Sequence, residues 1–186
     1  MDNNKVMISK TINDNDTALV YYSYALMTKL NGNLRYYFME NNFEANEIID
    51  GLWLGSLESS YDKETLQKKN ITHVISVLAG YEPPFPNDFN YFVINTLDNQ
   101  SSDLFKVFDD CAEFIADAFS ENGNVLIHCA YGRSRSATIV SAYLVSSYGM
   151  DVDNILMLLK SKRQIVEPNP HYKTQLREYY HSKYQV

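Results

Sequence analysis

The stretch that decides the fold is "NVLIHCAYGRSRSATIVSAYLV", residues 124–145. It begins with an apolar run that ends at His128, passes through a short polar loop, and continues as an apolar, helix-forming segment from Ser136. A short apolar run that follows a turn signal at residues 122–124 predicts a buried strand. The sequence therefore predicts a strand, a loop over Cys129–Arg135 and a buried helix over about residues 136–148.

The composition of this loop is suited to binding an anion. In α/β sheets, ligands bind beyond the carboxyl ends of the strands, where backbone N–H groups and the dipole of the next helix provide partial positive charge. The same field and the neighbouring Arg135 favour a thiolate, so we expect the pKa of Cys129 to lie below its usual value. Arg135 can also hold two phosphate oxygens with its planar guanidinium, and Gly132 allows a tight turn.

The rest of the sequence alternates between strand-like and helix-like segments. Asp50-Gly51 predicts a tight turn between two short strands in "EIIDGLWLG", residues 47–55. The other expected strands span residues 71–78, 91–97 and 125–128, and the expected helices span residues 62–69, 104–119, 136–148, 152–162 and 171–183. This alternation predicts an α/β fold with a mostly parallel central sheet flanked by helices.

The first 46 residues are predicted to be an N-terminal extension that is partly disordered and lies outside the main domain. Residues 1–16 are polar and rich in Asn and Asp, which is typical of poorly ordered segments. Residues 17–30 carry apolar side chains at helical spacing and are expected to form a helix. The main domain is predicted to span residues 47–184.

Charge and cysteine content exclude several classes of protein. A formal net charge of −7 argues against nucleic acid as the main partner. The two cysteines form no C-x-x-C pair, which favours a reducing, intracellular compartment, and Cys111 lies on the apolar face of an expected helix, as a core residue would. The start resembles no signal or transit peptide, and the apolar run at residues 18–27 is too short to cross a bilayer. We therefore expect a cytoplasmic protein, with a nuclear location also open, and no stable membrane insertion.

The segment "HCAYGRSRS", residues 128–136, matches the pattern His-Cys-x5-Arg-Ser and resembles the phosphate-binding loop of the cysteine-based protein tyrosine phosphatases. The resemblance covers about residues 47–180. Within them, "IIDGLWLGS", "ITHVISVL", "INTLDNQSSDLF", "FIADAF" and "KRQIVEPNPHYKTQL" follow each other as they do in small, atypical dual-specificity phosphatases. The loop pattern alone is weak, but the ordered set is specific, and it implies the fold of that superfamily.

The resemblance also implies a role for each residue of the loop. Cys129 is similar to the family's nucleophile, which forms a phosphocysteine intermediate. Arg135 and the loop amides would hold the phosphoryl oxygens. The residues expected to bind the substrate phosphate are Ala130, Tyr131, Gly132, Arg133, Ser134 and Arg135. Ser136 matches the hydroxyl that assists breakdown of the intermediate.

A general acid is expected in the loop after a strand, some thirty residues before the nucleophile. Asp98 lies 31 residues before Cys129 and directly follows an expected strand. Asp103 is the alternative, although it stands where a helix N-terminus favours a negative charge. Two residues are expected to support the site: His128, as a structural residue that hydrogen-bonds the loop, and Asn169, chiefly as the cap of the last helix and partly as a brace for the loop.

The implied activity is that of a dual-specificity protein phosphatase, which acts on phosphotyrosine and on phosphoserine or phosphothreonine without a cofactor or metal. The expected partners are phosphorylated proteins, kinases among them, and the expected state is a monomer or weak homodimer. One alternative is a phosphoinositide or other phospholipid phosphatase, in which Arg133, otherwise expected to be a solvated charge at the rim of the pocket, would recruit an additional anionic group. Another is a module that binds phosphoproteins without turnover, against which the complete set of catalytic residues argues.

Overall fold

A six-stranded sheet forms the centre of the protein. The computed structural model describes residues 6–10 and 43–184. The strands lie in the order β1-β5-β4-β6-β3-β2, and all neighbours are parallel except the β2–β3 hairpin. Their bounds are β1 Val6–Lys10, β2 Ala45–Ile49, β3 Leu52–Gly55, β4 Ile71–Val77, β5 Asn90–Asn95 and β6 Asn124–His128. The predicted α/β fold with a mostly parallel sheet is confirmed.

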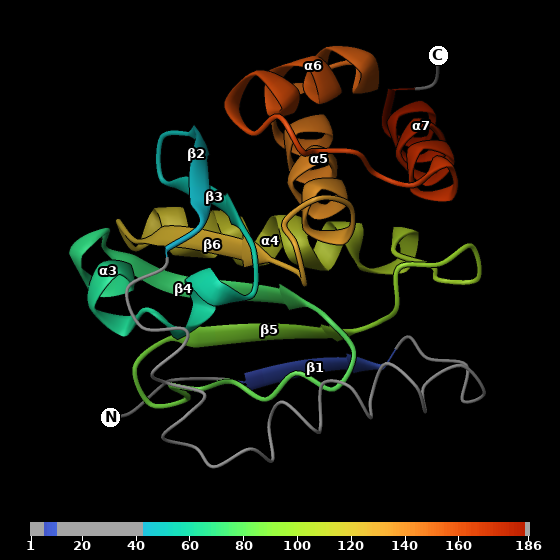
Figure 1. Ribbon diagram of the computed structural model, residues 1–186. Coiled ribbons are helices and arrows are strands. Elements are labelled where there is room, and N and C mark those ends of the chain that lie inside the picture. Colours follow the sequence, from blue (N-terminus) through green and yellow to red (C-terminus); the bar gives the residue numbers. More distant parts are fainter. Residues whose placement is uncertain (1–5, 11–42, 185–186) are drawn as a thin grey trace.

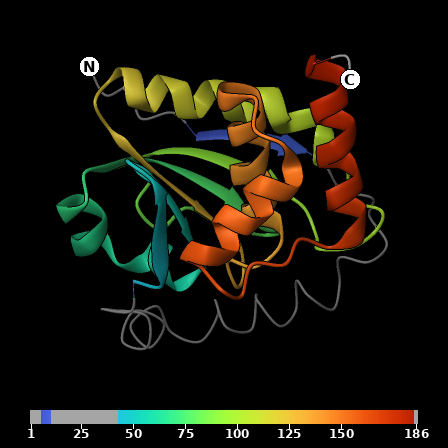
Figure 2. The ribbon, with the colours of Figure 1, turned by 90° about the horizontal axis from the view of Figure 1, so that it is seen from above.

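Helices pack on both faces of this sheet. The described helices are α3 Lys63–Lys68, α4 Phe108–Ser120, α5 Arg135–Tyr148, α6 Val152–Lys162 and α7 Pro170–Tyr184, with short 3-10 turns at Glu58–Tyr61 and Phe105–Val107. Figures 1 and 2 show α4 to α7 gathered on one side of the sheet, with α5 in their middle. Gly149 ends α5 in the left-handed conformation, at a φ of 62°.

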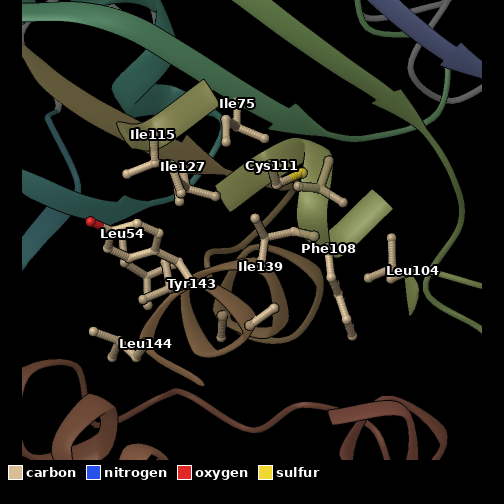
Figure 3. Packing of buried hydrophobic residues seen from close by; sticks show 14 of the residues in the cluster. Leu54, Ile75, Leu104, Phe108, Cys111, Ile115, Ile127, Ile139, Tyr143 and Leu144 are labelled. Carbon is tan, nitrogen blue, oxygen red and sulfur yellow. The ribbon is translucent and has the colours of Figure 1, made fainter. Parts of the chain in front are cut away.

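Alternate residues of the central strands point to opposite faces, so two apolar clusters form. Ile75 and Ile127 pack with α4 and α5 in the larger cluster (Figure 3), while Val74 and Leu126 pack on the other face beneath α3 and the loop before β5. Cys111 is 1% exposed within the larger cluster, which confirms its place in the core. Both faces of the sheet are covered, as a parallel sheet requires.

The beginning of the chain differs from the prediction. Residues 6–10 form the edge strand β1, which pairs in parallel with β5 from Val6 opposite Tyr91 to Lys10 opposite Asn95. The expectation that residues 1–16 are poorly ordered is therefore wrong for this segment, and β2 also begins two residues before the expected domain start. The β-branched Val6 and Ile8 favour a strand, but the surrounding Asn and Asp residues concealed that signal. The helix expected at residues 17–30 lies outside the described residues.

Parallel pairing also explains where the site lies. Strands β5, β4 and β6 run in the same direction, so their carboxyl ends meet at one edge of the sheet. The loop that follows β6 carries Cys129, and the loop that follows β5 carries Asp98. Residues 31 positions apart in sequence are thereby brought to the same edge.

Candidate active site

The loop between β6 and α5 turns at a position that only glycine fits. Gly132 has a φ of +64°, in the left-handed region that side chains disfavour. A Cβ atom there would also lie 2.6 Å from the backbone oxygen of Gly55, which is far closer than a carbon atom can approach. The expected tight turn is confirmed, and it brings this loop against the end of β3.

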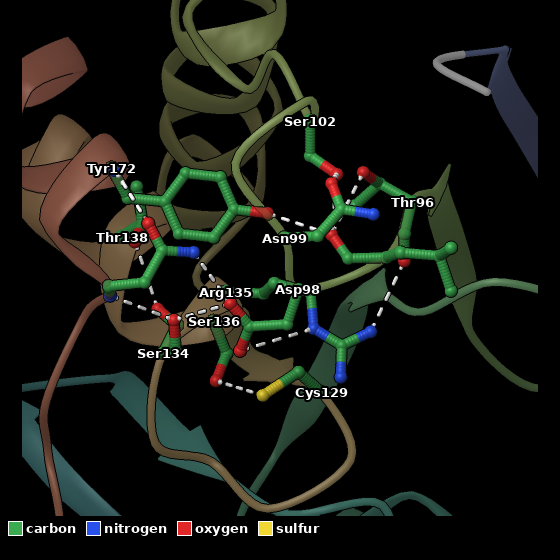
Figure 4. Close-up of polar contacts among 12 residues, drawn as sticks. Thr96, Asp98, Asn99, Ser102, Cys129, Ser134, Arg135, Ser136, Thr138 and Tyr172 are labelled. Carbon is green, nitrogen blue, oxygen red and sulfur yellow. Dashed lines mark hydrogen bonds and ion pairs between the residues drawn. The ribbon is translucent and has the colours of Figure 1, made fainter. Parts of the chain in front are cut away.

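Cys129 is buried and has a lowered pKa. Its side chain is 2% exposed. Burial by itself would raise the pKa of the thiol, but the charge of Arg135, the hydroxyl of Ser136 and the backbone N–H groups of Ser136 and Arg133 outweigh it. The Ser136 hydroxyl donates to the sulfur at 3.1 Å (Figure 4). The expected direction of the shift is confirmed, so the thiol of Cys129 ionises more readily than an ordinary cysteine.

Arg135 begins α5 and turns its guanidinium toward the loops that follow β5. Its Nη1 donates to the backbone oxygen of Thr96 at 3.2 Å, and its Nε lies 3.9 Å from Oδ2 of Asp98 (Figure 4). The residue is 7% exposed, and its buried Nε makes no hydrogen bond within the described part of the chain. A buried charged donor of this kind is costly unless an acceptor satisfies it, and a phosphoryl oxygen in the pocket can do so.

The structure separates the two candidate acids. Asp98 lines the same pocket as Cys129. Its Oδ1 accepts hydrogen bonds from the hydroxyl of Ser134 at 2.9 Å and from Nδ2 of Asn169 at 2.8 Å. Asp103 lies outside the residues that line this pocket; it accepts from the backbone N–H of Phe105 and pairs with a lysine one turn later. Geometry therefore favours Asp98, and Asp103 acts as the helix-end residue that the sequence indicated.

Asn169 serves both of the purposes that the sequence suggested. Its Oδ1 accepts from the backbone N–H of Tyr172 at 2.9 Å, which caps α7. Its Nδ2 donates to Asp98, and its backbone N–H donates to the hydroxyl of Ser134 at 3.2 Å. One residue thus connects the start of α7, the candidate acid and the phosphate-binding loop.

His128 supports the loop from beneath. The residue is fully buried, and its ring meets the ring of Tyr81 edge to face at a centroid distance of 4.9 Å. Burial lowers the pKa of His128 to about 3, so the imidazole is neutral near pH 7. A neutral, buried ring agrees with a structural place and not with an acid or base. The hydrogen bond from this ring to the loop that the sequence predicted is not made, because both ring nitrogens are buried without a hydrogen-bond partner among the described residues.

The side chains and backbone of the loop border a single pocket of about 430 Å³. It is lined by Asp98, Cys129, Tyr131, Arg133, Ser134, Arg135, Glu167, Pro168, Asn169, Pro170 and Lys173. Of the predicted phosphate-binding residues, Ala130 is 8% exposed and its oxygen accepts from the backbone N–H of Leu57. Tyr131 and Arg133 are exposed at the pocket, Tyr131 to 75%. The structure thus brings Tyr131, Arg133, Ser134 and Arg135 of the predicted set to the pocket, whereas Ala130 and Gly132 are not among its lining residues.

Arg163 is a residue of the site that the sequence analysis missed. It follows α6, is 6% exposed, and binds the outer side of the loop: Nε donates to the oxygen of Gly132 and Nη2 to the oxygen of Tyr131, both at 2.9 Å. It also donates to Oδ1 of Asn46 at 3.0 Å and pairs with Glu44 at 2.9 Å. Holding the carbonyls outward turns the loop amides toward the pocket. The only available signal was its position in "KRQIVEPNPHYKTQL".

A second group that the sequence did not reveal surrounds Glu167. Its carboxylate accepts from Lys160 at 2.6 Å and from Lys173, and these two hydrogen bonds lower its pKa to about 2. Its backbone N–H donates to the oxygen of Arg133 at 2.8 Å. The segment that joins α6 to α7 therefore binds the phosphate loop along much of its length.

Two features are absent from the described part of the chain. Residues 6–10 and 43–184 contain no group of three or more His, Cys, Asp or Glu side chains that could hold a metal ion. No helix among them is both long and apolar enough to span a membrane.

Comparison with known proteins agrees with this geometry. Residues 52–182 match the family described as the dual specificity phosphatase, catalytic domain. The chain is 40% identical over 141 residues to dual specificity protein phosphatase 1B of Arabidopsis thaliana. These residues make up 76% of this chain and 84% of that protein. It is 39% identical over 138 residues to dual specificity protein phosphatase 19 of Mus musculus, covering 74% of this chain and 63% of the mouse protein.

Solved structures give the same result. The human tyrosine phosphatase-like serine/threonine/tyrosine-interacting protein has a TM-score of 0.74 at 32% identity, over 78% of this chain and all of that chain. The crystal structure of DUSP15 has a TM-score of 0.73 at 32% identity, over 77% of this chain and 92% of that chain. The fold and the loop define a cysteine-dependent phosphatase of the protein tyrosine phosphatase superfamily. Within that class, this chain belongs to the dual specificity phosphatase family.

Proposed function

We propose that this protein hydrolyses phosphate monoesters on phosphotyrosine and on phosphoserine or phosphothreonine of proteins, through a phosphocysteine intermediate. The observation that carries the proposal is a buried thiol, Cys129, that accepts a hydrogen bond from the Ser136 hydroxyl and shares one pocket with the buried Arg135, an arrangement that lowers the pKa of the thiol. Core packing gives no reason for such an arrangement, whereas a nucleophile for a phosphate dianion requires it.

The first step is the transfer of the phosphoryl group to sulfur. The Cys129 thiolate attacks the phosphorus, and the bond between phosphorus and the substrate oxygen breaks. Arg135 and the loop amides hold the equatorial oxygens, where charge is present in the transition state. Asp98 gives its proton to the leaving oxygen, so that the protein product departs as an alcohol or phenol.

The second step returns the enzyme to its starting state. Asp98, now a carboxylate, takes a proton from a water molecule as that water attacks the phosphocysteine. The bond between sulfur and phosphorus breaks, inorganic phosphate leaves, and the Ser136 hydroxyl donates to the departing thiolate across the 3.1 Å contact described above. Every step uses a side chain of this protein, so the scheme requires no metal.

The test is phosphate release by the wild-type protein and Cys129→Ser, with EDTA present, from phosphotyrosine peptides, phosphothreonine peptides and phosphoinositide vesicles. Release from both peptide classes that depends on Cys129 is the expected result. Release mainly from the vesicles would instead favour the lipid alternative. Tight peptide binding without release would make the protein a binding module. The cytoplasmic or nuclear location, the kinase partners and the monomeric or weakly dimeric state stay predictions.

A further inference from the structure

The three cations that line the pocket differ in what balances their charge. Arg135 is buried and faces Asp98 at 3.9 Å. Lys173 is paired with Glu167. The guanidinium of Arg133 is exposed, and no described residue forms an ion pair or hydrogen bond with it. Among the described residues that line the pocket, Arg133 is therefore the cation without an ion-pair partner, so its charge can bind a ligand.

The backbone of Arg133 is fixed although its side chain is exposed. Its carbonyl oxygen accepts from the N–H of Glu167 at 2.8 Å, and its own N–H is among the donors that stabilise the Cys129 thiolate. The side chain thus leaves a rigid part of the loop at a set position beside the reacting sulfur. A charge held in this way gives geometric selectivity that a charge on a mobile surface segment does not.

Glu167 explains why Arg133 differs from Lys173, the lysine that lines the same pocket. A carboxylate in a phosphate pocket would repel substrate, but Lys160 and Lys173 both bind this one and offset its charge. Glu167 in turn satisfies Lys173 and leaves no carboxylate for Arg133. Among the described residues, this wall therefore presents one positive charge without an ion-pair partner, that of Arg133, next to the position of the substrate phosphate.

We propose that Arg133 forms a second anion-binding subsite, which recognises an acidic group on the peptide chain close to the phosphorylated residue of the substrate. That group is a carboxylate or a second phosphate, since both match the planar donors of arginine. The inference rests on the proposed protein phosphatase activity and adds a preference for acidic surroundings. A peptide is favoured over an anionic membrane because a protein with a formal charge of −7 is repelled by such a surface.

The experiment uses phosphotyrosine peptides in matched pairs. The two peptides of a pair differ at one position, which is one of the two positions before or the two positions after the phosphotyrosine. That position is Glu in one peptide and Gln in the other. The quantity measured is the ratio of kcat/KM for the Glu peptide to that for the Gln peptide. Effects on the reacting phosphate itself cancel in this ratio, so it reports on the subsite alone.

For the wild-type protein we expect a ratio of about three to five at one or more positions at low salt, as for a partly exposed ion pair. The ratio should fall toward one as salt rises from about 50 mM to about 500 mM, because salt screens exposed charges. Arg133→Ala should bring the ratio to about one at low salt, and Arg133→Lys should keep part of the preference.

Lys68→Ala is the matched control for loss of one positive charge. Lys68 is 70% exposed at the end of α3, just before β4 begins, and thus at the sheet edge opposite to the pocket. Its removal should leave the ratio as in the wild type. If Lys68→Ala lowers the ratio as much as Arg133→Ala does, the preference for the Glu peptide is caused by the net charge of the protein. That result would overturn the subsite.

The remaining outcomes separate the subsite from the activity on which it rests. Release from all peptides with wild-type ratios near one would overturn the subsite and leave the phosphatase function intact. No release from any peptide would overturn the proposed function. Arg133-dependent release confined to phosphoinositide vesicles would assign Arg133 to a lipid headgroup and overturn the peptide subsite.

Discussion

The two cysteines of this protein are almost equally buried, at 1% and 2% exposure, but the pKa values of their thiols are shifted in opposite directions. Cys111 lies among apolar side chains of α4 and the sheet, and burial raises its pKa far above the usual value. Cys129 belongs to the same apolar cluster, yet its pKa is lowered because Arg135 and several hydrogen-bond donors surround the sulfur. The comparison shows that burial disfavours the ionised form of a thiol. Whether the thiolate forms nevertheless depends on how many donors and positive charges surround the sulfur.

The largest expected effect comes from replacing each thiol in turn. Cys129→Ser should lower phosphate release from a phosphotyrosine peptide by about 10³-fold or more, because a serine hydroxyl does not ionise in this range of pH. Cys111→Ala should keep the activity and lower the free energy of unfolding by about 1 kcal/mol, through the small cavity left in the core. Phosphate release measures the activity of both variants, and urea unfolding measures their free energy of unfolding. A Cys111→Ala protein that is folded but inactive would contradict the comparison.

The next largest effect concerns the general acid Asp98, which lines the pocket of Cys129 and has no counterpart beside Cys111. Asp98→Asn removes the transferable proton while its side-chain oxygen can still accept from Ser134 and Asn169. We expect kcat to fall by about 10²-fold on phosphotyrosine peptides, and by less on an aryl phosphate whose leaving group needs no proton. Asp103→Asn is the control. A larger loss in the control than in Asp98→Asn would show that the wrong acid has been assigned.

A smaller effect is expected from releasing the carbonyls that orient the loop amides. Arg163→Ala removes the hydrogen bonds to Gly132 and Tyr131, so the loop no longer holds its amides toward the phosphate. We expect kcat/KM to fall by about tenfold to a hundredfold, as misplacement of a reacting group does, and inhibition by vanadate to weaken in parallel. The neighbouring exposed Lys162→Ala should change neither quantity. Unaltered vanadate inhibition in Arg163→Ala would mean that the arginine only stabilises the fold.

The smallest effect concerns a single donor to the sulfur. Ser136→Ala removes a hydrogen bond that favours the thiolate, so the pKa of Cys129 should rise toward its ordinary value. A smaller fraction of Cys129 is then thiolate at pH 6, and alkylation by iodoacetamide there should slow by about threefold. The midpoint of the alkylation rate against pH should move to higher pH. A midpoint at lower pH than in the wild type would contradict the assigned direction.

The sequence was sufficient for those features that depend on local pattern. Apolar runs and turn residues predicted β3 to β6 and the helices from α3 to α7, and the loop composition predicted the lowered pKa of Cys129. The spacing of Asp98 from Cys129 was informative because parallel strands bring their carboxyl ends together.

Features that depend on distant contacts could not be predicted in the same way. Arg163 reaches Gly132 and Glu44 across 31 and 119 residues of sequence, and nothing local distinguishes it from a solvated arginine. Lys160, Glu167 and Lys173 look like ordinary surface charges until the chain that joins α6 to α7 is seen to border the pocket. The edge strand β1 was missed because its pairing with β5, and not its own short sequence, marks it as part of the sheet.

The ion pair between Arg163 and Glu44 has a practical consequence for where the catalytic unit begins. The match to the family starts at residue 52, but Glu44 and Asn46 bind the arginine that holds the phosphate loop, and β1 extends the sheet beside β5. A protein trimmed to residues 52–182 would keep every catalytic side chain and still lose both anchors of Arg163. We therefore expect the smallest fully active fragment to be longer than the matched region, residues 52–182, because the contacts that support the loop begin before residue 52.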